Sequence, residues 1–304
     1  MEIQMNEPQL QPAPVVSSVV GKTAKSATWR GFYRKLAKNK AALAGAFIVF
    51  TFIVLAVFAP YLAPHDPLKI TMADKLQGPS SEHWLGTDDK GRDILSRLLY
   101  GSRISLTVGF LSTILGAAVG IVLGVVSGYY GRWVDSLIMR FCDVLLAFPG
   151  ILLALAIVSV LGASTTNVVI AVAFFAVPTF ARIVRGSTLS VKKLEYIDAI
   201  KAMGAKDSRI IFRHILPNIL SPIIVQATLY IASAIITAAA LSFLGMGTQP
   251  PAPEWGTMLS QGRSYIRQAA HITLFPGLAI LLVVVGFNLF GDGLRDALDP
   301  KTKK

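Results

Sequence analysis

The chain has 304 residues, of which 53% are hydrophobic and 15% are charged, and its mean hydropathy is +0.59. Soluble domains carry roughly 25% charged residues, so this composition excludes an ordinary soluble fold and indicates a protein that lies in lipid. The formal net charge is +12, but no basic motif is interleaved with aromatic residues, and the Lys and Arg residues gather between apolar runs. The charge therefore indicates membrane topology and not nucleic-acid binding.

Residues 1–40 are polar and then basic, which is unlike a cleavable signal peptide. We expect a retained tail here, with residues 8–20 disordered. The uncharged residues 41–63 form the first predicted transmembrane helix, because about 20 helical residues cross a hydrocarbon core of roughly 30 Å. A predicted external loop, residues 64–103, follows this helix.

The second predicted span, residues 104–131, is uncharged and rich in small residues. Gly116, Gly120 and Gly124 recur every four residues, a spacing that lets a neighbouring helix approach closely. The sequence therefore predicts tight packing of this helix against another span.

Residues 144–181 form an uncharged run of 38 residues, about 57 Å long as a single helix and too long for one crossing. The run must turn back, and residues 162–167 supply the turn between the third and fourth predicted spans. Residues 215–243 and 272–290 form the fifth and sixth, separated by a proline-rich stretch that excludes a continuous helix.

The charges between the spans predict their orientation, because cytoplasmic segments are enriched in Lys and Arg. Residues 22–40 hold seven basic and no acidic residues, and residues 182–213 hold eight basic against three acidic. Residues 65–103 are balanced, with six of each. We expect both termini and the 182–213 segment to be cytoplasmic and the 65–103 segment to be external.

No pattern of catalytic residues is present: the sequence contains neither His-Glu-x-x-His nor Gly-x-Ser-x-Gly. His65, His83, His214 and His271 are scattered and are expected to be surface or interfacial residues. Cys142 is the single cysteine and is expected to pack as a small apolar residue. The uncharged spans hold no ionisable groups for ion coupling, which favours an external energy source.

Residues 195–204 predict a short amphipathic helix on the cytoplasmic side. Its projection separates an apolar face, formed by Tyr196, Ile197, Ile200 and Met203, from a charged face, formed by Glu195, Asp198 and Lys201. Gly204 offers a helix stop. Such a helix either lies in the lipid interface or docks into a partner.

The segment Asp198-Ala199-Ile200, with Gly204 six residues after Asp198 and Leu216-Pro217 twelve residues after Gly204, resembles the Glu-Ala-Ala loop of binding-protein-dependent importers. In that family the loop is the coupling helix that inserts into a groove on the ATPase subunit. The resemblance implies a coupling helix at about residues 190–205. It assigns this role to Glu195, Tyr196, Asp198, Ala199, Lys201, Gly204, Ala205, Leu216 and Pro217.

Three further blocks narrow the resemblance to dipeptide and oligopeptide permeases of the DppC or OppC type. The first is an external motif that includes Leu85, Gly86, Thr87, Asp88, Gly91, Arg92 and Asp93. From physics alone, Thr87 with Asp88 predicts a helix cap and turn, and Arg92 beside Asp93 predicts local ion pairing.

The second block ends the fifth span and contains Gln249, Glu254 and Trp255. These residues are candidates for the substrate entrance, with an alternative in which Glu254 and Trp255 mark the lipid interface. The third block, residues 287–300, has a charged half that is expected to end the sixth helix at the cytoplasmic face. Residues 292–304 are the predicted cytoplasmic tail.

The resemblance covers residues 38–300 and implies an all-α, MetI-like permease fold of the type I ABC importers. A core of five transmembrane helices, residues 104–291, follows one amino-terminal helix. It implies a cell inner membrane subunit without enzymatic activity or a cofactor of its own, in which ATP and Mg are bound by partners. The implied partners are a second permease of the DppB or OppB type, two ABC ATPases, an extracytoplasmic peptide-binding protein and membrane lipid.

The implied function is import of di- or oligopeptides by alternating access. Two alternatives stay open. Permeases of the same family carry nickel or other small solutes, and the chain could instead be a membrane scaffold without a transport role.

Overall fold

Helices build the framework of the protein. The computed structural model describes residues 29–298, and this range contains helices and loops but no β-strand. The predicted all-α class is confirmed. Among the described residues, five helices are long and apolar enough to cross a membrane, or six if one bent pair forms a span.

The first span is α2 (Lys40–Val57), and the short helix α1 (Trp29–Lys38) precedes it. Asn39 separates them and caps α2, since its side-chain oxygen accepts a hydrogen bond from the Ala42 amide at 3.1 Å. The short helix α3 (Ala59–Leu62) follows. The part of the predicted tail from residue 29 onward is therefore helical, whereas residues 8–20 lie outside the described range.

Helix α4 (Ile94–Tyr130) begins ten residues before the predicted start of the second span. It starts there because Asp93 caps it, with Oδ2 accepting from the Ser96 amide at 2.7 Å. The charged residue Arg97 does not end the helix, because its side chain is buried and bonds to the carbonyl of Pro67 at 3.1 Å. The last part of the predicted external loop is thus helical.

The third predicted span is a bent pair, α5 (Arg132–Ala147) and α6 (Gly150–Leu161), whose axes differ by 91°. Pro149 causes the break, since proline disfavours a helical conformation in the residue before it and Phe148 is extended. With 12 residues, α6 is about 18 Å long and cannot cross the hydrocarbon core alone. Residues 144–161 therefore do not form one continuous helix, and a sixth span is present only if the bent pair α5 and α6 counts as one.

The predicted turn after the third span is confirmed: α6 ends at Leu161, Gly162 has φ +94°, and α7 (Thr165–Lys192) begins after the cap Ser164. Helix α8 (Glu195–Ala202) follows, and then α9 (Asp207–Ile210) and the π-helical turn η2 (Ile211–Ile215) lead into α10 (Leu216–Phe243). The α11 helix (Trp255–Gly262) and the 3₁₀ turn η3 (Arg263–Tyr265) precede the last span.

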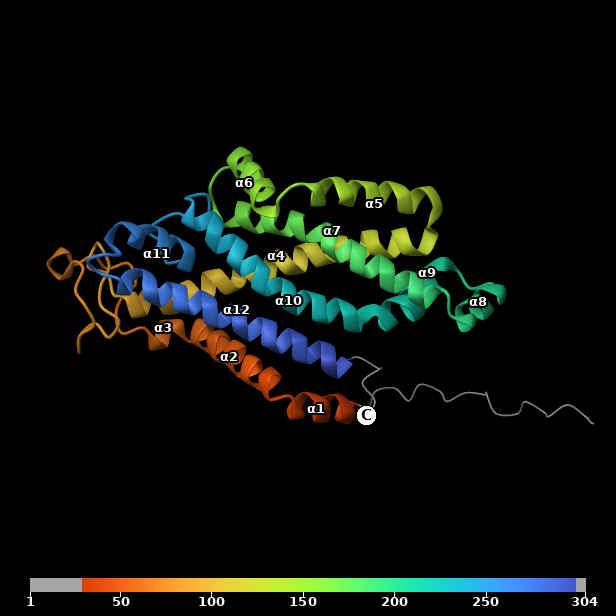
Figure 1. The fold of residues 1–304 in the computed structure, drawn as a ribbon, viewed down its shortest axis with the longest axis horizontal. Coiled ribbons are helices and arrows are strands. Elements are labelled where there is room, and N and C mark those ends of the chain that lie inside the picture. Colours follow the sequence, from red (N-terminus) through yellow and green to blue (C-terminus); the bar gives the residue numbers. More distant parts are fainter. Residues whose placement is uncertain (1–28, 299–304) are drawn as a thin grey trace, which may run out of the picture.

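The last span, α12 (His271–Leu298), runs eight residues past its predicted end. The charged segment past residue 290 also carries small buried residues, including Gly291 and Gly293. A Cβ atom at Gly293 would lie on the side chain of Ala42, so α12 and α2 touch there. The first and last spans therefore pack together along the bundle (Figure 1).

The predicted tight packing of the second span is confirmed, and its partner is α7. A Cβ at Gly120 would lie 2.5 Å from Cβ of Phe180 and 2.8 Å from the carbonyl oxygen of Val177. Gly116 and Gly124 face Ala176 and Ala181 in the same way. Small residues thus let these two helices approach until backbone meets side chain.

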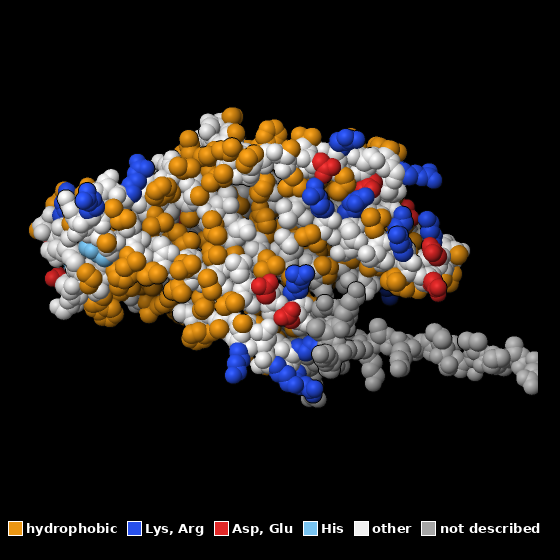
Figure 2. Space-filling view, in the orientation of Figure 1, with side chains coloured by type: hydrophobic (Ala, Val, Ile, Leu, Met, Phe, Trp, Pro, Cys, Tyr) orange, Lys and Arg blue, Asp and Glu red, His pale blue; other side chains and the backbone are white. Residues whose placement is uncertain are grey.

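The molecule has two distinct ends (Figure 1). The loop end contains residues 63–93 and α11, and the α8 end contains α8 and α9. Figure 2 shows formal charges near both ends and a broad hydrophobic belt between them. The balanced segment and the basic segment identified in the sequence therefore lie at opposite ends of the bundle.

Candidate functional site

The α8 end carries the predicted coupling segment as a separate helix with a defined stop. The Gly204 amide donates to the carbonyl of Lys201 at 3.0 Å, and the Ala205 amide donates to that of Ile200 at 3.3 Å. This paired pattern, with Gly204 at φ +82°, is a Schellman motif, so the predicted helix stop is confirmed. Glycine fits because other residues rarely adopt this φ.

The predicted apolar face of α8 is divided between the bundle and the surface. Ile197 is 2% exposed and packs with Ile215 and Ile219, and Ile200 is packed against the same cluster. Tyr196 and Met203 are instead 41% and 78% exposed. The outer surface of α8 therefore combines apolar side chains with charges.

The remaining coupling candidates surround this helix. Glu195, Asp198, Ala199 and Lys201 are exposed on α8, and Pro217 is exposed in the first turn of α10. Ala205 and Leu216 are half-buried and pack against the cluster that also holds Ile197. The structure thus brings the two halves of the sequence motif together at one end of the bundle.

Polar contacts tie the α8 end to the spans. Tyr129, at the end of α4, donates from its hydroxyl to Asp207 Oδ1 at 2.6 Å. Lys192, at the end of α7, donates to the Tyr129 carbonyl at 2.5 Å. Asn218 of α10 donates to the Tyr196 hydroxyl at 3.2 Å. Of these bonds, that of Asn218 joins α8 to α10, that of Tyr129 joins α9 to α4, and that of Lys192 joins α7 to α4.

The external motif forms a buried polar cluster at the loop end. Asp88 Oδ2 accepts from Arg92 Nε at 2.7 Å, and Arg97 Nε lies 3.4 Å from the same oxygen. The predicted pairing of Arg92 with Asp93 is therefore wrong, because Arg92 turns to Asp88 and to Gln261 of α11 at 3.1 Å.

The predicted cap by Thr87 and Asp88 is also wrong, since Asp93 caps α4. Asp88 Oδ1 accepts from the amides of Lys90 and Arg92, so the turn at Asp88 is confirmed. The turn allows Thr87 and Asp93 to form an isolated antiparallel bridge. Gly86 and Gly91 lie in this turn with positive φ, and Leu85 packs against the core.

The prediction that His83 is a surface or interfacial residue is also wrong. His83 is 6% exposed and its Nδ1 lies 2.9 Å from Asp93 Oδ1, so it is not a surface residue. Arg97 was missed as well, although it is one of the largest fully buried side chains in the described range. A basic residue at an early position of an apolar helix is the signal that could have identified it.

Two of the three substrate-entrance candidates are buried. Glu254 is 2% exposed and caps α11, with its carboxylate accepting from the amides of Gly256 and Thr257 at 3.0 and 2.8 Å. Trp255 is fully buried and donates to the Leu98 carbonyl at 3.1 Å, so it does not mark a lipid interface. Gln249 is exposed beside them.

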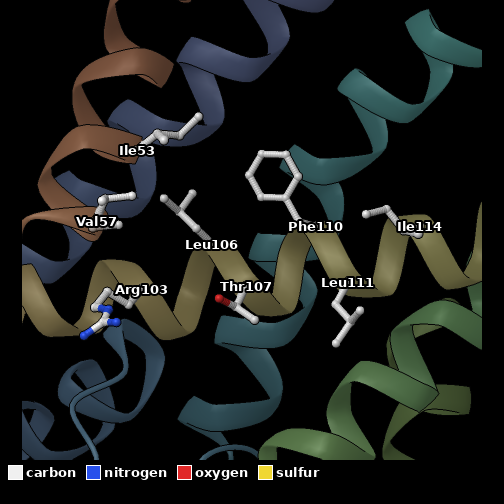
Figure 3. Close-up of a pocket in the computed structure, with 9 residues that line it drawn as sticks. Ile53, Val57, Arg103, Leu106, Thr107, Phe110, Leu111 and Ile114 are labelled. Atoms are coloured by element: carbon white, nitrogen blue, oxygen red, sulfur yellow. The ribbon is translucent and has the colours of Figure 1, made fainter.

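A groove of about 470 Å³ lies on the outer face between α2 and α4 (Figure 3). Its walls are apolar, including Ile53, Leu106 and Phe110, and Arg103 stands at one end. Such a face suits lipid chains or a neighbouring transmembrane helix.

The described residues thus form a bundle of five or six apolar helices long enough to cross a membrane, with the exposed helix α8 at one end. Residues 120–304 match the family of binding-protein-dependent transport system inner membrane components. Residues 28–79 match the N-terminal TM domain of oligopeptide transport permease C.

Similar proteins agree with these matches. The dipeptide transport system permease protein DppC of Alkalihalophilus pseudofirmus is 51% identical over 303 residues, covering 100% of both chains. The glutathione transport system permease protein GsiD of Pectobacterium atrosepticum is 53% identical over 276 residues, covering 90% of this chain and 92% of the relative.

The fold resembles that of a chain in inward-facing MetNI methionine ABC transporter structures, with a TM-score of 0.55 and 19% identity. That likeness covers 68% of this chain and 98% of the other. The chain therefore belongs to the binding-protein-dependent transport system inner membrane component family. It is a multi-pass permease subunit of an ABC importer.

Proposed function

We propose that this subunit carries di- or oligopeptides across the cytoplasmic membrane by alternating access, driven by ATP hydrolysis on partner subunits. The observation that carries the proposal is the α8 end, where the exposed α8 is bonded to α10 and the adjoining α9 is bonded to α4. The similarity to dipeptide and glutathione permeases supports a short peptide as the substrate.

The α8 helix is the proposed contact with an ATPase. Its exposed Tyr196 and Met203 offer apolar area, and the acidic residues Glu195 and Asp198 surround them. Movement of a docked ATPase would displace α8 and the adjoining α9. The Asn218–Tyr196 bond would pass the displacement of α8 to α10, and the Tyr129–Asp207 bond would pass that of α9 to α4. Coupling of this kind requires different contacts in the two states of the transporter.

The charge distribution supports an orientation with α8 inside. Residues 182–213 carry eight basic residues against three acidic, and the loop-end segment is balanced. By the positive-inside tendency, α8 faces the cytoplasm and the loop end faces the extracytoplasmic side. There the loop end would meet a peptide-binding protein, and the apolar outer faces would meet lipid and a second permease.

Uptake by the reconstituted transporter tests the proposal. Proteoliposomes that contain this chain, its permease partner, two ATPases and the binding protein should accumulate a labelled dipeptide only with internal ATP. The ligand that co-purifies with the binding protein should be a peptide. Uptake of nickel in place of peptide, or no ATP-dependent uptake of either, would contradict the assignment.

A further inference from the structure

Three potential metal ligands from separate parts of the chain meet at the loop end. His65 follows α3, His83 lies in the loop, and Asp93 caps α4. Nδ1 of His83 lies 2.9 Å and Nδ1 of His65 lies 3.8 Å from Oδ1 of Asp93. One ligand atom from each of the three side chains lies within 4.8 Å of the other two.

The two aspartate oxygens have different surroundings. Oδ2 of Asp93 accepts from the amide and from the hydroxyl of Ser96, each at 2.7 Å. Oδ1 is thereby turned toward the two imidazoles. The Ser96 hydroxyl oxygen also accepts from the backbone amide of His65 at 3.1 Å. One serine therefore orients the carboxylate and anchors the backbone of a histidine, as the supporting residues of metal ligands do.

The three side chains differ in their exposure to solvent. The side chains of Asp93 and His83 are 1% and 8% exposed, whereas that of His65 is 30% exposed. Nδ1 of His65 is shielded from solvent and has no hydrogen-bond partner. A buried polar atom without a partner is costly, and a metal ion would satisfy this one.

We propose that His65, His83 and Asp93 bind one divalent transition-metal ion, with zinc as the best fit. Two imidazole nitrogens and one carboxylate oxygen suit zinc, which binds such ligands at about 2.0–2.2 Å. Ligand atoms in a tetrahedral site of that size lie about 3.3 Å apart, and the distances of 2.9 and 3.8 Å bracket this value. The half-exposed His65 ring needs only a small rotation to complete the set.

The ion has a structural consequence at the loop end. It would link the segment after α3, the loop and the start of α4, in addition to the bonds of Ser96 to His65 and of Arg97 to Pro67. Water would take the fourth position on the side where His65 is exposed.

Zinc binding to the full chain purified in detergent tests this site. After treatment with a chelator and its removal, we expect about one zinc per chain at micromolar free zinc, measured by mass spectrometry and competition with a chromophoric chelator. Zinc should also raise the midpoint of thermal unfolding. His65→Ala is the informative variant, because its ring Nδ1 makes no hydrogen bond and the backbone bond to Ser96 remains.

We expect His65→Ala to bind zinc at least about 100-fold more weakly while unfolding at the same temperature without zinc. His271→Gln is the matched control at the same end, since His271 bonds to the Thr87 carbonyl and lies outside the cluster. It should bind zinc as the unaltered chain does. Failure of the unaltered chain to bind zinc, or equal binding by His65→Ala, would overturn the proposal.

Discussion

Arg185 of α7 and Asp135 of α5 form a two-pronged ion pair, with Nε donating to Oδ1 at 2.5 Å and Nη2 donating to Oδ2 at 2.6 Å. Ser127 of α4 donates to the same Oδ1 at 2.5 Å, so one carboxylate joins three helices. A second pair, Arg182 with Asp143 at 2.8 Å, links α7 and α5 but is more than half exposed on both sides. The two ion pairs join the same helices, so a partly buried link can be compared with an exposed one.

We expect Asp135→Asn to lower the free energy of unfolding by about 1–2 kcal/mol, a value reduced for the partial exposure of the pair. Asp143→Asn should change it by less than about 0.5 kcal/mol, because exposed pairs contribute little. Thermal unfolding followed by a thiol-reactive dye checks this, since the single cysteine, Cys142, is fully buried on α5. Equal effects of the two variants would show that Asp135 is not a structural link.

The buried carboxylate of Glu254 leads to a prediction about the substrate-entrance candidates. We expect Glu254→Ala to cost about 2–3 kcal/mol, because two amides of α11 and the hydroxyl of Ser105 at 3.2 Å lose their acceptor. The KM for peptide of the remaining folded transporter should be unchanged. Normal stability with a raised KM would mean that Glu254 contacts the substrate.

The contact between α4 and α7 predicts intolerance to a single methyl group. Gly120→Ala places a Cβ 2.5 Å from that of Phe180 and should destabilise the protein by about 1–3 kcal/mol. Gly186→Ala is the control, because no atom lies within 4 Å of its added Cβ and alanine favours helices. The midpoints of thermal unfolding of both variants test this prediction. A Gly120→Ala variant as stable as the unaltered chain would contradict the observed packing.

The stop of α8 predicts a specific defect in coupling. An added Cβ at Gly204 meets no atom within 4 Å, so Gly204→Ala acts through its φ of +82° alone, at about 1–2 kcal/mol. We expect ATP hydrolysis to persist while peptide uptake falls several-fold. Gly204→Asn should retain more uptake, since asparagine tolerates this conformation better. Normal peptide uptake by Gly204→Ala would show that the Schellman motif is not needed for coupling.

Features with a local signal were predictable from the sequence. The uncharged runs predicted the long apolar helices. The four-residue glycine spacing predicted the close packing of α4 against another helix, and Gly204 predicted the end of α8. The early start of α4 was missed because apolar runs do not reveal a buried Arg97, whose partners include the carbonyl of Pro67, 30 residues away.

Contacts between distant residues explain the other errors. Pro149 lies within an uninterrupted apolar run, and only the axes of α5 and α6 show that the chain bends by 91° there. His83 is buried because Asp93 bonds to it after the chain has passed through a turn. The site candidates at Glu254 and Trp255 were selected by resemblance, which does not show whether a side chain faces the bundle or the surface.

We propose that the α8 end faces the cytoplasm and docks an ATPase. Met203, 78% exposed beside the Gly204 stop, is the position to test. In a Cys142→Ser background, Met203→Cys should react with an impermeant thiol reagent only from the cytoplasmic side and should cross-link to the ATPase in a nucleotide-dependent manner. Labelling from the extracytoplasmic side would contradict the proposed orientation. Free labelling without a cross-link in the assembled transporter would contradict docking of the ATPase on α8.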